Sequence, residues 1–563
     1  MSKRSLSPAP APTAKRLHTS GASGIHETAR KTTLSFNDSL YDELVVCIFS
    51  HLSWIDLCAA QATSRNWYRL AADNELWRNL YLNAFGRSRL RGSRGHVTRS
   101  DGREVRPLPG WANTKKEAVK DWKWMFRISS NWKKGRCAIE ELDENSQSSS
   151  RESGLGSSCE TLVLLAGSLT ITASTQPSDL PTIKLSIFPT INHSLTCESR
   201  AGRTPCRLST LAIDQSPPLL GQLRLAAFLS TGEFTVFSIN PAQLSTSFRK
   251  LTYVPRRGRP MDSSTLQAVY HHPLLITLSQ SFSLSIYDLS DDNVRHTQTL
   301  SSFTSFPPTS LVLSTPSPAT YKLVLAYTIP VYPAHWSVGA TELIISGPSG
   351  PPNPLVPPSS FSNSTPTIVE PMCVVSTRTT RALDIPHGWI DEDKLRSMRE
   401  QWGRKVSRVT DTQTDGKWVV LAPAEAAPSS RIFSTSFISI PDTISTHDTS
   451  YLHSTAALQL YRLYLPPLSN SVAASPPKLV FVRSLHGQTG PISSLALADG
   501  RCVSLGHNGS LWVWDLEAGT GAEISGPSGS TEDTHSVKRA VAFDERRIVT
   551  TEGSRVIMRR FDI

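Results

Sequence analysis

The chain has 563 residues, of which 58 are Lys or Arg and 47 are Asp or Glu, and its formal net charge is +11. That length exceeds what one ordinary compact core holds, so we expect several domains or one large all-β unit beside a smaller domain. No segment holds the roughly 18 to 20 apolar residues that a membrane-spanning helix needs. The first residues, MSKRSLSPAPAP, lack the apolar run of a secretory signal. We therefore expect a soluble intracellular protein, nuclear or cytoplasmic, with no membrane partner.

The eight cysteines are scattered along the chain, and no two of them have CxxC spacing. No pair of histidines completes a zinc-binding pattern either. Scattered single cysteines are typical of reduced thiols that serve as small apolar side chains. The sequence therefore predicts no metal site and no cofactor.

Residues 1–33 are rich in Pro, Ala, Ser, Thr and basic residues, a composition that predicts a disordered tail. Two basic pairs, Lys3-Arg4 and Lys15-Arg16, have the spacing of a bipartite nuclear import signal. Residues 78–136 hold 16 basic and 4 acidic residues, a balance of +12 that exceeds the net charge of the whole chain. This basic block is either a solvated connector or a site for an anionic partner such as nucleic acid.

Residues 34–85 predict a bundle of three short amphipathic helices. The first helix is expected from about Leu40 to Leu52, capped by Ser39 or Asn37, because DELVVCIFSHL draws an apolar stripe at helical spacing. A second helix is expected in WIDLCAAQATSRNWYRLA, with Asp56 as its cap, and a third in ELWRNLYLNAF. A bundle of this size buries a low fraction of its surface, so its remaining apolar surface indicates a partner.

The same segment resembles the F-box family. The family pattern is Leu-Pro-x-Glu-Leu, an Ile-Phe-Ser-x-Leu run, Asp-Leu, a Trp, and a Leu-Trp pair. This chain has LYDELVVCIFSHL, then IDL at 55–57, Trp67 and Leu76-Trp77, with Tyr41 where the family usually has Pro. Proline at that point favours the first turn of a helix, so its replacement by Tyr41 should weaken the start of the first helix without removing the motif.

The resemblance implies binding to a Skp-type adaptor and, through it, to a cullin-based ubiquitin ligase. A plain three-helix core would explain the periodicity but not the coincident motif matches. The resemblance implies an apolar adaptor-facing surface made of Leu40, Leu44, Ile48, Phe49, Leu52, Leu57, Trp67, Leu76 and Trp77. The last three of these residues are also expected to hold the bundle together.

Residues 86–158 are expected to form a basic connector with a helix near 115–131 and a low-complexity, disordered end. The helix is predicted because Ala118, Trp122, Met125 and Phe126 share one helical face. Its ending, NWKKGRC, resembles the junction that precedes the propeller in F-box proteins with WD repeats. Such a helix would tie the F-box rigidly to the C-terminal domain.

Residues 159–563 change to a period of two, which predicts β-strands. In ADGRCVSLGHNGSLWVWDLEAG, Asn508-Gly509 is a strong hairpin signal, since both residues tolerate positive φ. The Trp514-Asp515 ending resembles the close of a WD repeat, with Gly487-Gln488 where that family has Gly-His. In the family a buried polar network joins the strands of a blade.

Weaker copies recur about every 50 residues, each an alternating strand with an aromatic or apolar end. We expect a seven-bladed WD-like propeller with one large insertion at about 347–416. The seven strand ends are Phe188, Phe237, Tyr287, Ile345, Tyr461, Trp514 and Phe561.

The expected insertion contains GPSGPPNPLVPPSS, which predicts no regular structure, and then GWIDEDKLRSMREQWGRKV. Leu395, Met398, Trp402 and Val406 form a helical stripe in the second segment. This helix either decorates the side of the propeller by packing on it or binds a partner.

No motif for catalysis is found: there is no GxSxG, P-loop or HExxH. A non-catalytic protein is therefore expected. Arg256, Arg257 and Arg259 form a basic loop between expected blades. They could bind an acidic or phosphorylated segment of a protein cargo, since the Arg fork matches phosphate; the alternative is a solvated loop.

The sequence thus predicts a multidomain chain, a small α-helical F-box followed by an all-β propeller. The leading function is substrate recognition for a Skp–cullin–F-box ubiquitin ligase, with an unidentified protein as cargo. The alternatives are a nuclear scaffold that binds nucleic acid through residues 78–136, and an F-box protein that acts outside ubiquitination.

Overall fold

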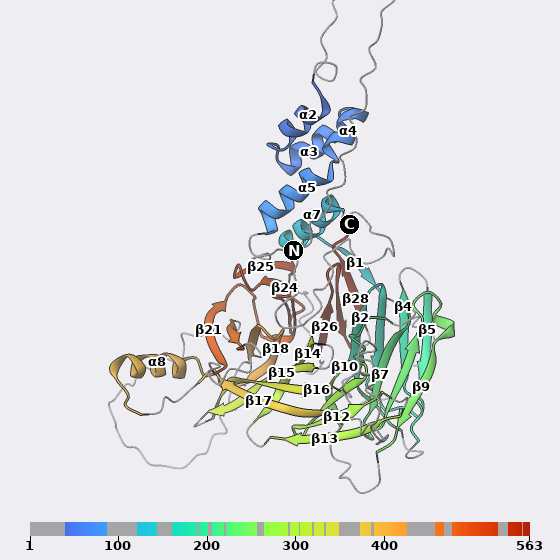
Figure 1. The fold of residues 1–563 in the computed structure, drawn as a ribbon, viewed down its shortest axis with the longest axis vertical. Coiled ribbons are helices and arrows are strands. Elements are labelled where there is room, and N and C mark those ends of the chain that lie inside the picture. The colour runs from blue at the N-terminus through green and yellow to red at the C-terminus, as the bar shows by residue number, and fades with distance from the viewer. Residues whose placement is uncertain are drawn as a thin grey trace, which may run out of the picture. The chain divides into compact units, whose positions relative to one another are not determined.

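The protein is represented by a computed structural model (Figure 1). The chain separates into two compact units, with the boundary between Leu76 and Trp77. The structure describes residues 40–86, 121–142, 160–187, 191–200, 205–218, 221–255, 264–290, 293–302, 305–317, 320–331, 334–347, 372–383, 388–424, 457–466, 476–526, 539–553 and 555–563.

The first unit is helical, and its first helix is shorter than predicted. Helix α2 spans Asp42–Phe49, because Tyr41 has extended backbone and accepts the first helical hydrogen bonds from Leu44 and Val45. After Phe49 the amides of residues 50–52 bond to carbonyls three residues earlier, which tightens the chain into a turn. The other helices of this region are α3 (Trp54–Gln61), α4 (Arg65–Ala71) and α5 (Asn74–Tyr81).

The second predicted helix is two helices, because serine side chains cap each of them. The Ser53 hydroxyl accepts the amide of Asp56 at 3.3 Å, so Ser53 and not Asp56 is the cap of α3. Ser64 accepts the amide of Trp67 at 3.1 Å and starts α4. The apolar periodicity predicts Ser64 inside a helix, but a serine that bonds the backbone ahead of it favours a helix start.

In the second unit, the strands of the described residues form seven antiparallel sheets of four strands each, the blades of a propeller. Blades 1 to 4 contain β2 (Thr161–Ala166), β3 (Leu169–Ser174), β4 (Thr182–Ile187) and β5 (Ile191–Thr196); β6 (Leu208–Ile213), β7 (Leu223–Leu229), β8 (Phe234–Ile239) and β9 (Phe248–Tyr253); β10 (Thr265–His271), β11 (Leu274–Ser279), β12 (Ser283–Asp288) and β13 (Arg295–Ser301); β14 (Phe306–Ser317), β15 (Thr320–Val331), β16 (His335–Ser346) and β17 (Cys373–Arg381).

Blades 5 to 7 complete the ring. Their strands are β18 (Val409–Thr414), β19 (Trp418–Pro423), β20 (Leu458–Tyr464) and β21 (Lys478–Leu485); β22 (Ile492–Ala498), β23 (Arg501–Gly506), β24 (Leu511–Asp515) and β25 (Thr520–Ser525); β26 (Arg539–Phe543), β27 (Arg547–Glu552), β28 (Arg555–Arg560) and β1 (Ala138–Glu141). The unit also holds η1 (Leu82–Gly86), α7 (Trp122–Lys134), η2 (Leu244–Thr246) and α8 (Glu392–Gly403).

The first strands of the seven blades are neighbours around the ring, and β26 of the last blade lies against β2 of the first. The ring is closed within the last sheet, where β1 pairs antiparallel with β28 from Ala138↔Arg560 to Glu141↔Ile557. The sequence pattern predicts residues 138–141 as part of the connector. The strand signal is weak because AIEE is short and half acidic, and its partner strand lies at the other end of the chain.

The predicted seven blades are confirmed. Each strand predicted from the recurring aromatic pattern is the third strand of a blade: β4, β8, β12, β16, β20, β24 and β28. Phe188 itself lies outside the described residues, directly after β4. Apolar clusters fill the interfaces between neighbouring blades, so these third strands are part of a continuous packed ring.

The segment expected as an insertion holds two propeller strands. β17 is the outer strand of blade 4 and β18 the inner strand of blade 5, so the stretch between blades is shorter than 347–416. β17 gives little signal because an outer strand is largely exposed: its sequence CVVSTRTTR alternates between exposed and half-buried residues and carries few apolar side chains. The predicted helix is present as α8, and residues 348–371 lie outside the described part.

Candidate partner-binding surfaces

Helix α2 divides the predicted apolar stripe into a buried and an exposed side. Val45 and Phe49 are buried, and the Phe49 ring meets Trp67 edge-on at 5.5 Å between centroids. Leu44 and Ile48, four residues apart on the same face, are 50% and 44% exposed. A pair of large apolar side chains exposed side by side on one helix face is typical of a protein-binding surface.

The other predicted adaptor-facing residues have different surroundings. Leu40, Leu52 and Trp67 are half-buried. Phe49, Leu57, Leu76 and Trp77 are buried, so these four stabilise their units and present little surface. Trp77 belongs to the second unit, where its ring meets Phe126 of α7 at 5.6 Å.

Three exposed large apolar residues of this region, Tyr41, Ile55 and Tyr68, were not predicted as binding residues. Tyr41 is the most exposed large apolar residue before α2, and Ile55 is exposed in the first turn of α3. The sequence marks the positions of Tyr41 and Ile55 relative to the F-box pattern. Tyr41 occupies the position where the pattern has Pro, and Ile55 precedes the Asp-Leu pair of the pattern. Charged residues lie beside these exposed apolar side chains, and Asp42 of α2 forms an exposed ion pair of 2.5 Å with Arg69 of α4. Such exposed pairs contribute little stability.

Helix α7 binds the last blade of the propeller through the predicted NWKKGRC junction. Asn131 Nδ2 donates to the carbonyl of Phe561 at 2.9 Å, and Trp132 Nε1 donates to the carbonyl of Glu545 at 3.0 Å. Gly135 ends the helix with a φ of 67°, and a Cβ there would overlap the carbonyl oxygen of Glu523. The junction therefore needs glycine both for its left-handed backbone and for its close approach to β25.

The WD-like hairpin of blade 6 contains a buried polar network in which Gln488 stands where the family has His. Trp514 Nε1 donates to the Ser504 hydroxyl at 2.8 Å, and that hydroxyl donates to Gln488 Oε1 at 2.5 Å. Gln488 Nε2 donates to Ser510 at 3.4 Å. The Asp515 carboxylate accepts two amides of the following turn, both at 3.1 Å. The Trp514 indole thus bonds the neighbouring strand of the blade, and the Asp515 carboxylate bonds the turn after β24.

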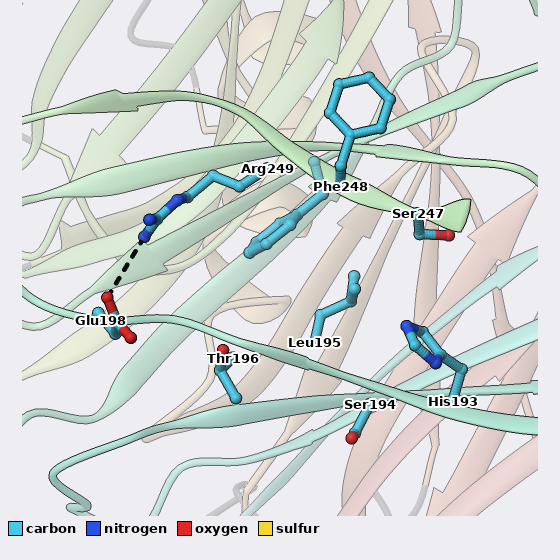
Figure 2. A pocket seen from close by; sticks show the side chains of 9 residues that line it. His193, Ser194, Leu195, Thr196, Glu198, Ser247, Phe248 and Arg249 are labelled. Carbon is cyan, nitrogen blue, oxygen red and sulfur yellow. Dashed lines mark ion pairs between the residues drawn. The ribbon is translucent and has the colours of Figure 1, made fainter. Parts of the chain in front are cut away.

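A groove of about 290 Å³ lies between the outer strands of blades 1 and 2 (Figure 2). Arg249 of β9 and Glu198, just after β5, form an ion pair of 3.8 Å across it. Both side chains are partly exposed, so they remain open to other charged groups. The lining of the groove is mostly polar, which suits a polar peptide segment. It consists of His193, Ser194, Leu195, Thr196, Glu198, Phe237, Ser247, Phe248 and Arg249.

A second cavity of about 220 Å³ lies along the inner strands of blades 2 to 5. Polar side chains connect those strands: Ser310 donates to Gln413 Oε1 at 3.1 Å, and Gln413 Nε2 donates to Asp411 Oδ1 at 3.0 Å. Asp411 Oδ2 accepts the amide of Leu495 in blade 6 at 2.7 Å. Burial raises the pKa of the Asp411 carboxyl to about 6, against the lowering effect of these hydrogen bonds.

The predicted cargo-binding residues Arg256, Arg257 and Arg259 lie outside the described residues, because one described range ends at Pro255 and the next begins at Ser264. Their role stays a prediction. Across the described ranges, no group of three or more His, Cys, Asp and Glu side chains is arranged to hold a metal ion. None of the helices in those ranges is long and apolar enough to cross a membrane.

Comparison with known families identifies the helical region. Residues 39–83 match the family model described as F-box-like, so the chain carries an F-box-like domain. No curated protein matches the chain. An F-box-like domain followed by a seven-bladed propeller defines the class of protein, an architecture typical of non-catalytic receptor subunits.

Proposed function

We propose that the protein is a substrate receptor of a Skp–cullin–F-box ubiquitin ligase. The observation that carries this proposal is the F-box-like domain at residues 39–83, which exposes Leu44 and Ile48, in the same chain as a propeller. Covering these two side chains with a Skp-type adaptor would remove apolar surface from water, worth roughly 25 cal/mol per Å².

The propeller would hold the cargo. The receptor needs no reactive group for this task, since it acts by proximity: it raises the effective concentration of a cargo lysine near the conjugating enzyme. The groove formed by β5 and β9 is one candidate cargo surface, because its Arg249 and Glu198 can bind charged peptide groups. The loop with Arg256, Arg257 and Arg259 is the other, and replacing all three with Ala without loss of cargo binding would remove it.

Adaptor binding is tested by co-purification of the full chain with a Skp-type adaptor. We expect the wild type to retain the adaptor and Leu44→Asp/Ile48→Asp to lose at least tenfold in affinity, because charge on a buried apolar interface is costly. The matched control is Val375→Asp, since Val375 is 67% exposed but lies on β17 of the propeller. Wild-type affinity in the double variant, or a wild type that does not bind, would contradict the proposal.

A folding control separates the surface from the core of the helical unit. Leu44 and Ile48 are already exposed, so their replacement should leave the circular dichroism and melting of the protein unchanged. Leu57 is buried, and Leu57→Ala should destabilise the helices by about 2 to 5 kcal/mol. Loss of binding with an intact fold would assign Leu44 and Ile48 to the interface.

A further inference from the structure

Helix α8 presents an apolar stripe that is largely exposed in the described part of the chain, apart from the Lys405 ammonium 4.8 Å from the centre of the Trp402 ring. None of its 12 residues is buried. Leu395 and Trp402 are exposed, and Met398 is half-buried between them on the same face. Trp389 and Ile390, which precede the helix, are also exposed, Trp389 by 86%.

The C-terminal end of α8 is attached to the propeller. Val406 forms a β-bridge with Trp336 of blade 4. Gln459 of blade 5 donates to the carbonyl of Arg404 at 3.0 Å, and the Arg404 guanidinium lies 4.3 Å from the centre of the Phe481 ring. The helix is therefore anchored at one end, and Figure 1 shows it lying outside the ring of sheets.

Two charged residues beside the stripe, Glu392 and Arg399, could pair with the same residues of a second copy of the helix. Glu392 and Arg399 are seven residues apart, two helical turns, and so lie on one side of the stripe. Neither makes an ion pair within the described residues, whereas three other acidic residues of this segment are paired within it, at 3.8, 3.6 and 3.4 Å.

We propose that two copies of the chain associate through α8, packed antiparallel about a two-fold axis between Leu395 and Arg396. This register places Glu392 opposite Arg399 of the other copy, twice, and brings the two Leu395 side chains together beside the two-fold axis. In a parallel pair related by a two-fold axis, Glu392 and Arg399 of the two copies would lie on opposite flanks of the interface and could not pair. The interface is isologous and therefore closes as a dimer.

The helix is short, so the interface is small and the dimer is weak. Interfaces of this size are typical of transient association, and we expect a dissociation constant on the order of micromolar. The proposal does not depend on adaptor binding, since α8 belongs to the propeller unit.

Sedimentation velocity of the full chain over a range of concentrations tests the association. The wild type should shift from monomer to dimer as its concentration rises, and Leu395→Asp/Trp402→Asp should stay monomeric throughout. The control Phe248→Asp, an exposed apolar residue of β9, should behave as the wild type does. A wild type that is monomeric at all concentrations, or a dimer that survives the double Asp variant, would overturn the proposal.

Charge exchange tests the antiparallel register. Glu392→Arg and Arg399→Glu should each weaken the dimer by about tenfold, because each places like charges opposite one another twice. An equimolar mixture of the two variants should form a heterodimer, and one chain with both changes should regain wild-type association. Failure of both the mixture and the combined variant to recover would exclude this pairing.

Discussion

The indole ring of Trp132 in α7 stacks on the ring of Phe561 at the end of the chain, with 3.9 Å between centroids and 14° between planes. The neighbouring Asn131 bonds the carbonyl of Phe561, a residue 430 positions away in the sequence. The guanidinium of Arg501 also lies over the indole, 4.3 Å from its centre. Helix α7, which was predicted as part of the connector, thus belongs to the propeller unit.

Replacing Trp132 with Ala should lower the free energy of unfolding of the propeller by about 3 to 5 kcal/mol, because it removes a buried ring and the partner of the Glu545 carbonyl. Urea denaturation followed by circular dichroism measures this change. Trp389→Ala is the matched control, and it should change stability by less than about 0.5 kcal/mol because Trp389 is exposed. Equal effects of the two variants would show that the Trp132 contact is dispensable.

Arg547 joins the last blade to the first. Its buried guanidinium donates to the carbonyls of Gly167 at 2.7 Å and Leu169 at 3.1 Å, and pairs with Asp544 at 3.0 Å. Arg547→Ala leaves these groups without their partner, so we expect a loss of about 3 kcal/mol and faster amide exchange in β2 and β3.

The control for this contact between two blades is Arg555→Ala, which removes an exposed ion pair with Glu141 within the last blade. Its cost should be below about 1 kcal/mol. Hydrogen exchange measured on both variants separates local opening from general destabilisation. If amide exchange in β2 and β3 is unchanged in Arg547→Ala, the residue does not hold the first blade to the last.

The network of blade 6 predicts that Ser504→Ala costs about 2 kcal/mol, because Trp514 Nε1 and Gln488 Oε1 both lose their buried partner. Thermal unfolding measures the effect. Ser285→Ala is the control: its hydroxyl bonds only the exposed side chain of Thr299, and its loss should be nearly neutral. A Ser504 variant as stable as the control would contradict the network.

The buried carboxyl of Asp411 should make the stability of the folded protein depend on pH. Its pKa is about 6 in the folded protein, raised from 3.8 by burial. Because the unfolded chain loses this proton at lower pH than the folded protein does, the stability that Asp411 contributes is present at low pH and is lost as pH rises through about 6. Relative to Asp411→Asn, the wild type should lose about 1 kcal/mol between pH 5 and pH 7. A difference between them that is flat, or that rises with pH, would contradict this.

Much of the propeller could be predicted from local sequence, because the third strand of each blade is packed against its neighbours and so carries a regular apolar pattern. The hairpin at Asn508-Gly509 was visible for a similar local reason: Gly509 has a φ of 79°, and Asn508 Oδ1 accepts the amide of Ser510 at 3.0 Å. β1 and β17 could not be predicted in this way. Each is an outer strand that is defined by its partner and not by its own composition.

The F-box motif was visible from its spacing, but the roles of its residues were not. Leu44 and Val45 are adjacent in sequence and similar in chemistry, and one is half exposed while the other is buried. That difference depends on how α2 packs against α4, which includes the contact of Phe49 with Trp67. The network of Gln488 was also not predicted, because the family has a histidine where this chain has Gln488.

The most direct test of the receptor function is capture of the cullin. The full chain, a Skp-type adaptor and a tagged cullin are mixed, and the proteins retained with the cullin are measured. We predict that the chain and the adaptor are retained together, and that Leu44→Asp/Ile48→Asp is lost while Val375→Asp is retained. A chain that binds the adaptor but is never retained with the cullin would contradict the ligase function.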